Sequence, residues 1–243
     1  MTASPANRER PGRAYWSLAG LAEGVRVTLP LIPGTCVFAA AFGTIAAQKG
    51  LSAFEAVFMS GAVYAGASQL VALEAWQDRM TVGAVATVVL VTVIVNLRCL
   101  LMSASLRPWF GTLPAWQAYP PLFFTTDAQW LIGMRYRAEG GSDAAVFLGS
   151  GLIMWPLWTA STALGYWLGA LVADPKRFGF DLILPIFFAA MLVPLWRGKR
   201  RAASWAIAGA VALVTARLVP GWWFIVVGAL AGSFAAGFID ERE

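Results

Sequence analysis

Two polar side chains lie close together inside a long apolar stretch, where a soluble protein would rarely place them. Asn96 and Arg98 fall in the second half of an apolar run over residues 81–106. A charged arginine at the centre of a membrane helix costs about 2.5–3.5 kcal/mol on insertion scales, so it needs a partner. The candidate partners are Asp127 and Glu74. Such a pair either serves function or holds helices in a fixed geometry, and the residues leave both interpretations open.

A second group of polar and small residues follows in the apolar stretch over residues 53–76. It reads Tyr64-Ala65-Gly66-Ala67-Ser68-Gln69. A helix broken at Gly66 would free backbone N–H and C=O groups that bind a carboxylate or an ammonium group. Ser68 and Gln69 would add side-chain donors and acceptors. The alternative is close helix packing through the small residues.

The composition indicates a membrane protein. Of the 243 residues 59% are apolar and 13% are charged, against about 25% charged residues in ordinary soluble domains. There is no histidine, which excludes a histidine metal site and a Ser-His-Asp triad, and Cys36 and Cys99 are too few for a disulfide framework. We find no phosphate loop or metal-ligand spacing, and therefore expect no metal, no cofactor and no enzyme activity. The net charge of +5 is attributed to membrane topology and not to nucleic-acid binding.

The hydropathy pattern predicts an all-α fold, a polytopic bundle of transmembrane helices. About 20 apolar residues are needed to cross a bilayer, and eight segments qualify, with seven spans as the alternative. The segments cover residues 28–48, 53–76, 81–106, 119–135, 144–172, 181–197, 203–219 and 221–239. Pro30 and Pro33 are expected to kink the first of them.

Basic residues predict that both termini lie in the cytoplasm. We expect a basic cytoplasmic N-terminus over residues 1–26 with a short interfacial helix, one transport domain over residues 27–239, and a cytoplasmic tail over residues 240–243.

A weak internal repeat accompanies this topology. Pro33 recurs as Pro156, and Leu90-Val91-Thr92 recurs as Leu213-Val214-Thr215, each 123 positions later (156 − 33 and 213 − 90). This pattern predicts two parallel three-helix units joined by the fourth span, an arrangement known in transporters. Chance similarity within an apolar alphabet is the alternative.

Several of these stretches together resemble the AzlC family of branched-chain amino acid permeases. The stretches are Pro33-Gly34 to Phe42-Gly43, Ser60, Tyr64 to Gln69, Asn96-Leu97-Arg98 and Thr126-Asp127. The resemblance implies the large subunit of an exporter of branched-chain or related amino acids in the bacterial inner membrane. It also implies a small AzlD-like membrane partner and coupling to the proton gradient. This chain has Ala128 after Asp127, where the family pattern often has a second acidic residue.

The candidate site residues follow from the polar groups and the resemblance together. The predicted substrate-binding residues are Tyr64, Gly66, Ser68, Gln69, Asn96, Arg98 and Asp127. The candidates for carrying a proton are Asp127, Glu74, Glu55 and Asp181. We expect alternating access around a midplane site, with the substrate carboxylate at Arg98 or at the broken backbone. The ammonium would lie at Asp127, Asn96 or free carbonyls. A carrier for another small polar solute, a channel or scaffolding subunit, and a membrane-embedded enzyme are the alternatives.

Overall fold

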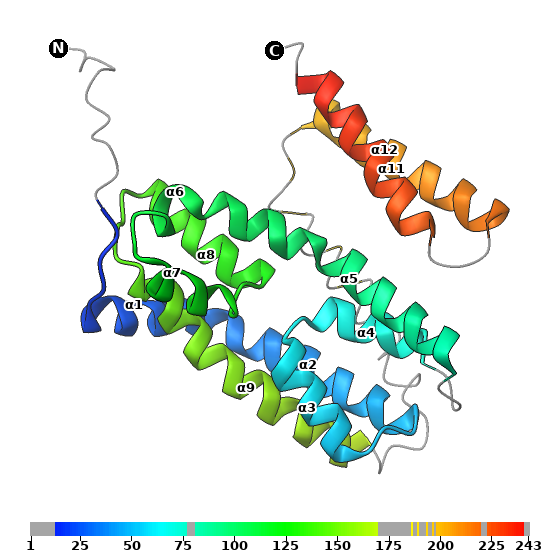
Figure 1. Ribbon diagram of the computed structural model, residues 1–243, viewed down its shortest axis with the longest axis horizontal. Coiled ribbons are helices and arrows are strands. Elements are labelled where there is room, and N and C mark those ends of the chain that lie inside the picture. Colours follow the sequence, from blue (N-terminus) through cyan, green and yellow to red (C-terminus); the bar gives the residue numbers. More distant parts are fainter. Residues whose placement is uncertain are drawn as a thin grey trace. The chain divides into compact units, whose positions relative to one another are not determined.

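The computed structural model describes residues 13–76, 81–169, 198–219 and 223–240, with single positions between 186 and 196. These residues are helical, apart from short turns and one isolated bridge between Tyr15 and Asp143. They fall into two compact units, residues 1–180 and residues 181–243, each of which is described by itself (Figure 1). The sequence predicted an all-α protein, which is confirmed. The predicted single transport domain over residues 27–239 stays a prediction.

The first span is a kinked helix. Helix α1 (Leu18–Thr28) starts at Ser17, whose side chain accepts a hydrogen bond from the Gly20 N–H. A 3₁₀ turn, η1 (Leu29–Leu31), follows, and α2 (Ile32–Gln48) continues the chain. Pro30 lies within the turn, and its missing N–H and fixed φ favour such an interruption. The predicted kink is therefore confirmed.

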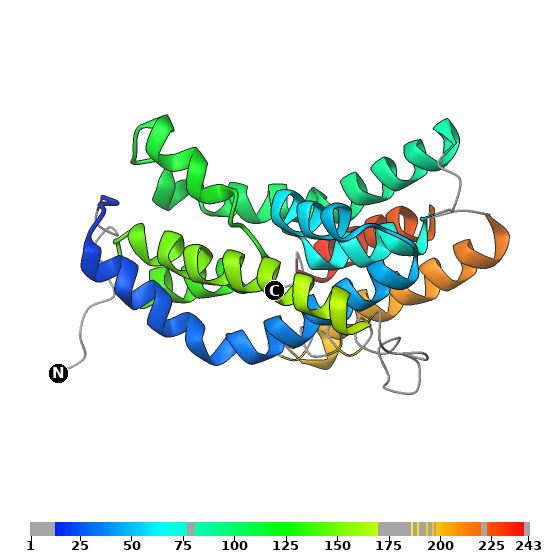
Figure 2. The ribbon, with the colours of Figure 1, turned by 90° about the horizontal axis from the view of Figure 1, so that it is seen from below.

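Helix α9 (Ala145–Gly169) is the central element of the first unit, because α1, α2 and α3 all pack on it. Figure 2 shows α1 and α2 running along α9. A Cβ on Gly24 would overlap the Val146 carbonyl, and a Cβ on Gly165 would overlap the Ala40 backbone. From α1 to α2, later residues thus meet later residues of α9, so α1 and α2 run parallel to α9, with backbones in direct contact through glycine.

The pairing between α1–α2 and α9 has the spacing of the predicted repeat. Gly20 lies against Asp143 and Gly43 lies against Tyr166, both 123 positions apart (143 − 20 and 166 − 43). Equivalent positions touch one another when two copies are related by a twofold axis that passes between them. The full three-helix repeat stays a prediction, because its span over residues 181–197 lies outside the described ranges.

The second predicted span is broken. Helix α3 (Ala53–Val63) begins with a capping box between Ser52 and Glu55 and ends at Tyr64. Tyr64 has a left-handed backbone with φ 47°, the only described residue other than glycine with positive φ. Helix α4 (Gly66–Glu74) then starts afresh. The break was predicted at Gly66, and the structure places it one to two residues earlier.

The fourth predicted span is also interrupted, so the expected continuous helix over residues 119–135 is wrong. Helix α5 (Val82–Ser105) leads through α6 (Arg107–Phe110) to α7 (Ala115–Leu122), which contains Pro120 and Pro121. Helix α8 (Asp127–Ala138) begins after an extended Thr126. Two adjacent prolines remove backbone donors from the helix, and at about 1.5 Å per residue neither piece alone spans a bilayer.

Two stretches of the described chain are long and apolar enough to cross a membrane, namely Leu18–Gln48 and Val82–Ser105. Only 6% of the most apolar part of α5 is buried within the protein, as expected for a lipid-facing helix. Helix α9 has 25 residues and no charged side chain. Its glycine, serine, threonine and tryptophan residues lower its mean hydropathy, and it is not one of these two stretches. The predicted number of spans and their orientation stay predictions.

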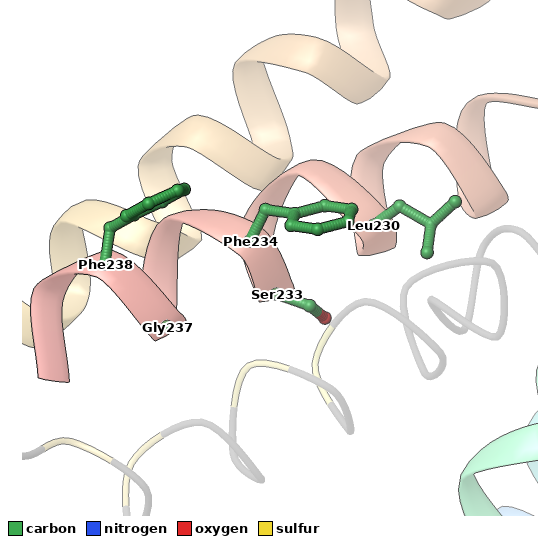
Figure 3. A pocket seen from close by; sticks show the side chains of 5 residues that line it. All are labelled: Leu230, Ser233, Phe234, Gly237 and Phe238. Atoms are coloured by element: carbon green, nitrogen blue, oxygen red, sulfur yellow. The ribbon is translucent and has the colours of Figure 1, made fainter. Parts of the chain in front are cut away.

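The second unit is a helical pair. Helix α11 (Lys199–Leu218) and helix α12 (Trp223–Asp240) match the predicted seventh and eighth spans closely. They touch through small residues, since a Cβ on Gly228 would lie 2.8 Å from Ala212 Cβ and a Cβ on Gly232 would lie 2.7 Å from Ala208 Cβ. Helix α12 carries an apolar hollow lined by Leu230, Ser233, Phe234, Gly237 and Phe238 (Figure 3).

Candidate functional site

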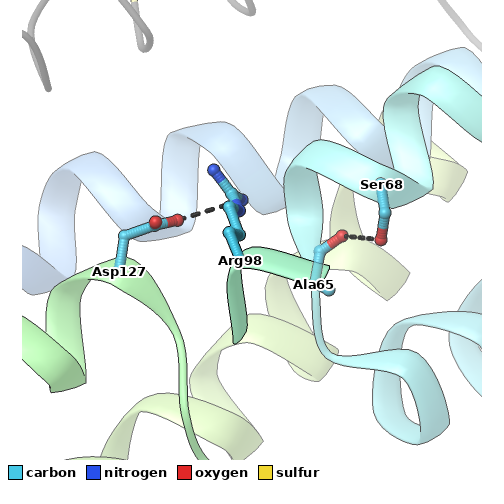
Figure 4. A network of polar contacts seen from close by, with 4 residues as sticks. All are labelled: Ala65, Ser68, Arg98 and Asp127. Carbon is cyan, nitrogen blue, oxygen red and sulfur yellow. Dashed lines mark hydrogen bonds and ion pairs between the residues drawn. The ribbon is translucent and has the colours of Figure 1, made fainter. Parts of the chain in front are cut away.

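An ion pair joins α5 to the start of α8. The Arg98 Nη2 atom lies 3.0 Å from the Asp127 Oδ2 atom, and the two side chains are 32% and 18% exposed. Asp127 is the first residue of α8, directly after the interruption between α7 and α8. Figure 4 shows Arg98 extending toward Asp127, with Ala65 and Ser68 of the other helix break in the same view. The predicted pairing of Arg98 with Asp127 is confirmed.

Tyr64 connects the two helix breaks. Its side chain is 4% exposed, and its hydroxyl accepts a hydrogen bond of 3.1 Å from Gln129 Nε2 in the first turn of α8. Its ring stacks on the Phe123 ring, with 6.2 Å between the ring centroids. It meets the rings of Phe124 and Trp158 edge to face, with centroid distances of 6.3 and 6.5 Å. The left-handed residue of one break is thus held by the chain of the other break and by α9.

The start of α4 is tightly enclosed. A Cβ on Gly66 would overlap the Trp158 ring and would lie 2.6 Å from Phe38, so Gly66 serves the expected close contact, whereas the break itself falls at Tyr64. The N-cap residue Ala65 supplies no side-chain cap, and Ser68 Oγ donates to the Ala65 carbonyl at 2.9 Å. The first-turn N–H groups of α4 therefore have no side-chain acceptor from the cap, and the positive end of the helix dipole points toward this region.

Buried polar atoms without partners among the described residues lie on the three helices that meet here. Both amide atoms of Gln69, the Gln129 Oε1 atom and the Trp158 Nε1 atom are buried and make no hydrogen bond to the described part of the chain. The side chains of Gln69 and Gln129 are completely buried. A buried polar group left unsatisfied typically destabilises a protein by about 1–3 kcal/mol. Such groups on helices that meet are unusual in a native structure, and they make this region the candidate binding site.

The other predicted residues are less central. Asn96 lies on α5 with a buried Oδ1 atom that has no partner among the described residues, but no contact places it beside Gln69. Glu74 is exposed at the end of α4, and within the described ranges it takes part in no ion pair. Glu55 caps α3, where its Oε2 atom accepts from the Ser52 N–H at 2.7 Å. Asp181 lies outside the described residues.

Sequence reasoning missed Gln129 and Trp158 as candidate site residues. The amide two residues after Asp127 could have been noticed, because a polar side chain inside a predicted membrane span is by default a functional candidate. Its contact with Tyr64 joins residues 65 positions apart, and no local pattern reveals it. Among the described residues there is no group of three or more His, Cys, Asp or Glu side chains that could hold a metal ion.

These features define a helical membrane protein in which two interrupted helices meet at a cluster of buried polar groups. A model of the family described as AzlC protein matches residues 30–172, more than half of the chain. The protein belongs to the AzlC family, whose members are membrane proteins generally linked to transport.

Two relatives cover nearly the whole chain. The inner membrane protein YgaZ of Escherichia coli is 26% identical, with 96% of this chain and 94% of YgaZ aligned. An uncharacterized membrane protein of Archaeoglobus fulgidus is 24% identical, with 90% of this chain and 95% of that protein aligned. No solved structure matches.

Proposed function

We propose that this protein is a carrier that exports branched-chain or related amino acids across the bacterial inner membrane and is not an enzyme. The observation that carries the proposal is the meeting of two broken helices at Tyr64 and Gln129. Broken helices occur in transporters because they bring backbone charge and polar side chains to a site inside the membrane. The resemblance to AzlC permeases supplies the substrate class.

The region around the breaks suits a small amphiphilic solute. The α4 N-terminus attracts a carboxylate, the buried amides offer further donors and acceptors, and aromatic side chains stand beside them. The ring centroids of Phe38 and Trp158 lie 5.5 Å apart, and those of Tyr64 and Phe124 lie 6.3 Å apart. An aliphatic side chain would be surrounded by these rings.

The Arg98–Asp127 pair is the proposed coupling element. Protonation of Asp127 would remove its negative charge and release Arg98 from an attraction across 3.0 Å. Because α5 and α8 are otherwise in limited contact, this change would favour a different arrangement of the two helices. Proton binding would then bias the carrier between inward-facing and outward-facing states. Glu55, Glu74 and Asp181 are the alternative proton carriers.

A small AzlD-like membrane subunit is the proposed partner. This proposal comes from the family resemblance alone. It states that the carrier works together with a second membrane protein, and it assigns no residue of the substrate site to that protein.

The test is export from cells loaded with labelled leucine, isoleucine or valine, expressing this chain with and without its small partner. We expect export that an uncoupler abolishes and that Arg98→Ala removes, with the variant still in the membrane. The matched control is Arg135→Ala, since Arg135 forms an exposed surface pair with Glu139 at 2.9 Å. Export that persists in Arg98→Ala, or no export in either condition, contradicts the proposal.

A further inference from the structure

We propose that the uncharged groups of Gln69, Gln129 and Trp158, and not the Arg98–Asp127 pair, hold the charged backbone groups of the substrate. This inference rests on the proposed function and assigns the binding groups of that site. Gln129 and Trp158 were not among the residues predicted from the sequence.

The unpaired amides need a partner that the described chain does not provide. Gln69 is completely buried, and neither its Nε2 nor its Oε1 atom has a hydrogen-bond partner within the described ranges. Burying an amide without partners is unfavourable. An unpaired buried amide is explained if its atoms bind a ligand. Without the ligand, the protein is then less stable than it would be with an apolar side chain at position 69.

Gln69, Gln129 and Trp158 belong to three helices that meet near the start of α4. Gln69 is one turn after Gly66, and a Cβ on Gly66 would lie 2.9 Å from Trp158 Cζ2, which is close in the ring to the indole N–H. Gln129 is tied to the same place through its hydrogen bond to Tyr64, two residues before Gly66. Trp158 of α9 and Gln129 of α8 therefore lie beside the start of α4, and Gln69 follows one turn further along that helix.

The available atoms match the two ends of a zwitterion. The Trp158 N–H, the Gln69 amide N–H groups and the first-turn N–H groups of α4 are donors, as a carboxylate requires. The Gln69 and Gln129 carbonyl oxygens are acceptors, as an ammonium group requires. The site has no net charge, so it fits a ligand whose own charges cancel.

Arg98 and Asp127 are already engaged with each other at 3.0 Å. A substrate that took their place would have to separate this pair, which is costly for partly buried charges. A pair left intact during binding remains available to respond to a proton. The neutral groups would thus bind and select the substrate, and the ion pair would couple its transport to proton binding.

The experiment compares the purified full-length variant Gln69→Met with the wild-type protein. Met is unbranched and of similar size, so it fills the same space without polar atoms. We expect the unfolding temperature of the variant in detergent, without ligand, to rise by about 2–4 °C. This is the shift expected when about 1 kcal/mol of destabilisation by the unpaired amide is removed from a chain of this length. L-leucine should stabilise the wild type and not the variant, and the KM for leucine export should rise at least about tenfold, the loss of one good hydrogen bond.

The matched control is Gln117→Met. Gln117 Oε1 accepts a hydrogen bond of 3.1 Å from Trp16 Nε1, so the same substitution there should lower the unfolding temperature and leave the KM unchanged. If Gln69→Met also lowers the unfolding temperature, Gln69 has a protein partner and the inference is overturned. An unchanged KM overturns it as well. If the wild type exports no branched-chain amino acid, the proposed function itself fails, which the parallel wild-type measurement shows separately.

Discussion

The guanidinium group of Arg98 and the carboxylate of Asp127 lie 3.0 Å apart and connect α5 to the first residue of α8. The pair can be a pin that fixes two helices or a switch that works during transport. The two possibilities differ in what happens when both charges are removed together.

Removal of one charge should weaken the protein more than removal of both. Asp127→Asn leaves an uncompensated, partly buried arginine and should lower stability by about 2 kcal/mol, below the 3–5 kcal/mol typical of fully buried pairs. The double variant Arg98→Met, Asp127→Asn should regain most of that loss in a detergent unfolding assay but should not regain export. Full export by the double variant would show that the pair is only a pin.

Glycine at position 165 should be irreplaceable. A Cβ there would overlap the Ala40 backbone, so Gly165→Ala should push α2 and α9 apart and cost about 1–3 kcal/mol. Gly34→Ala is the matched control, because a Cβ at this position of α2 meets nothing within 4 Å and alanine favours a helix. We expect a lower unfolding temperature only for Gly165→Ala; equal effects would argue against the close parallel packing.

Tyr64 should act mainly through its ring. Tyr64→Phe keeps the stacking on Phe123 and Trp158 and loses the hydrogen bond to Gln129, a change of about 0.5–1.5 kcal/mol. Tyr64→Ala removes the whole buried ring and should cost about 3–5 kcal/mol. Denaturation of the two variants in the same detergent checks this order. A similar loss for both would mean that the hydroxyl, and not the ring, holds the break.

Asp143 should anchor the chain that precedes α1. Its carboxylate accepts from the Ser17 N–H at 3.3 Å, from the Ser17 hydroxyl and from the Ala145 N–H at 3.0 Å. Asp143→Ala removes three acceptor contacts at a residue that is 3% exposed, and we expect a loss of about 2 kcal/mol or more.

Glu23→Ala is the control for this substitution. Glu23 is an exposed acid of α1 whose contact with Arg26 is 3.8 Å long, and exposed pairs contribute little. Comparable unfolding temperatures for the Asp143 and Glu23 variants would contradict the anchoring role.

The sequence alone determined the class of this protein, the position of its long helices, and the need of Arg98 for an acidic partner, for which it offered Asp127 and Glu74. Apolar length predicts a helix such as Val82–Ser105 because the bilayer core requires it, and an arginine in that helix requires an acid nearby. These properties depend on residues that are neighbours along the chain or on one simple energetic need.

Only the tertiary structure decided where the helices break and which groups meet there. The left-handed turn falls on Tyr64 and not on Gly66, because packing of its ring against Phe123, Phe124 and Trp158 outweighs the local preference for glycine. Likewise, the contact of Gln129 with Tyr64 joins residues on separate helices. Contacts of this kind arise from the packing of whole helices, which no local pattern of residues specifies.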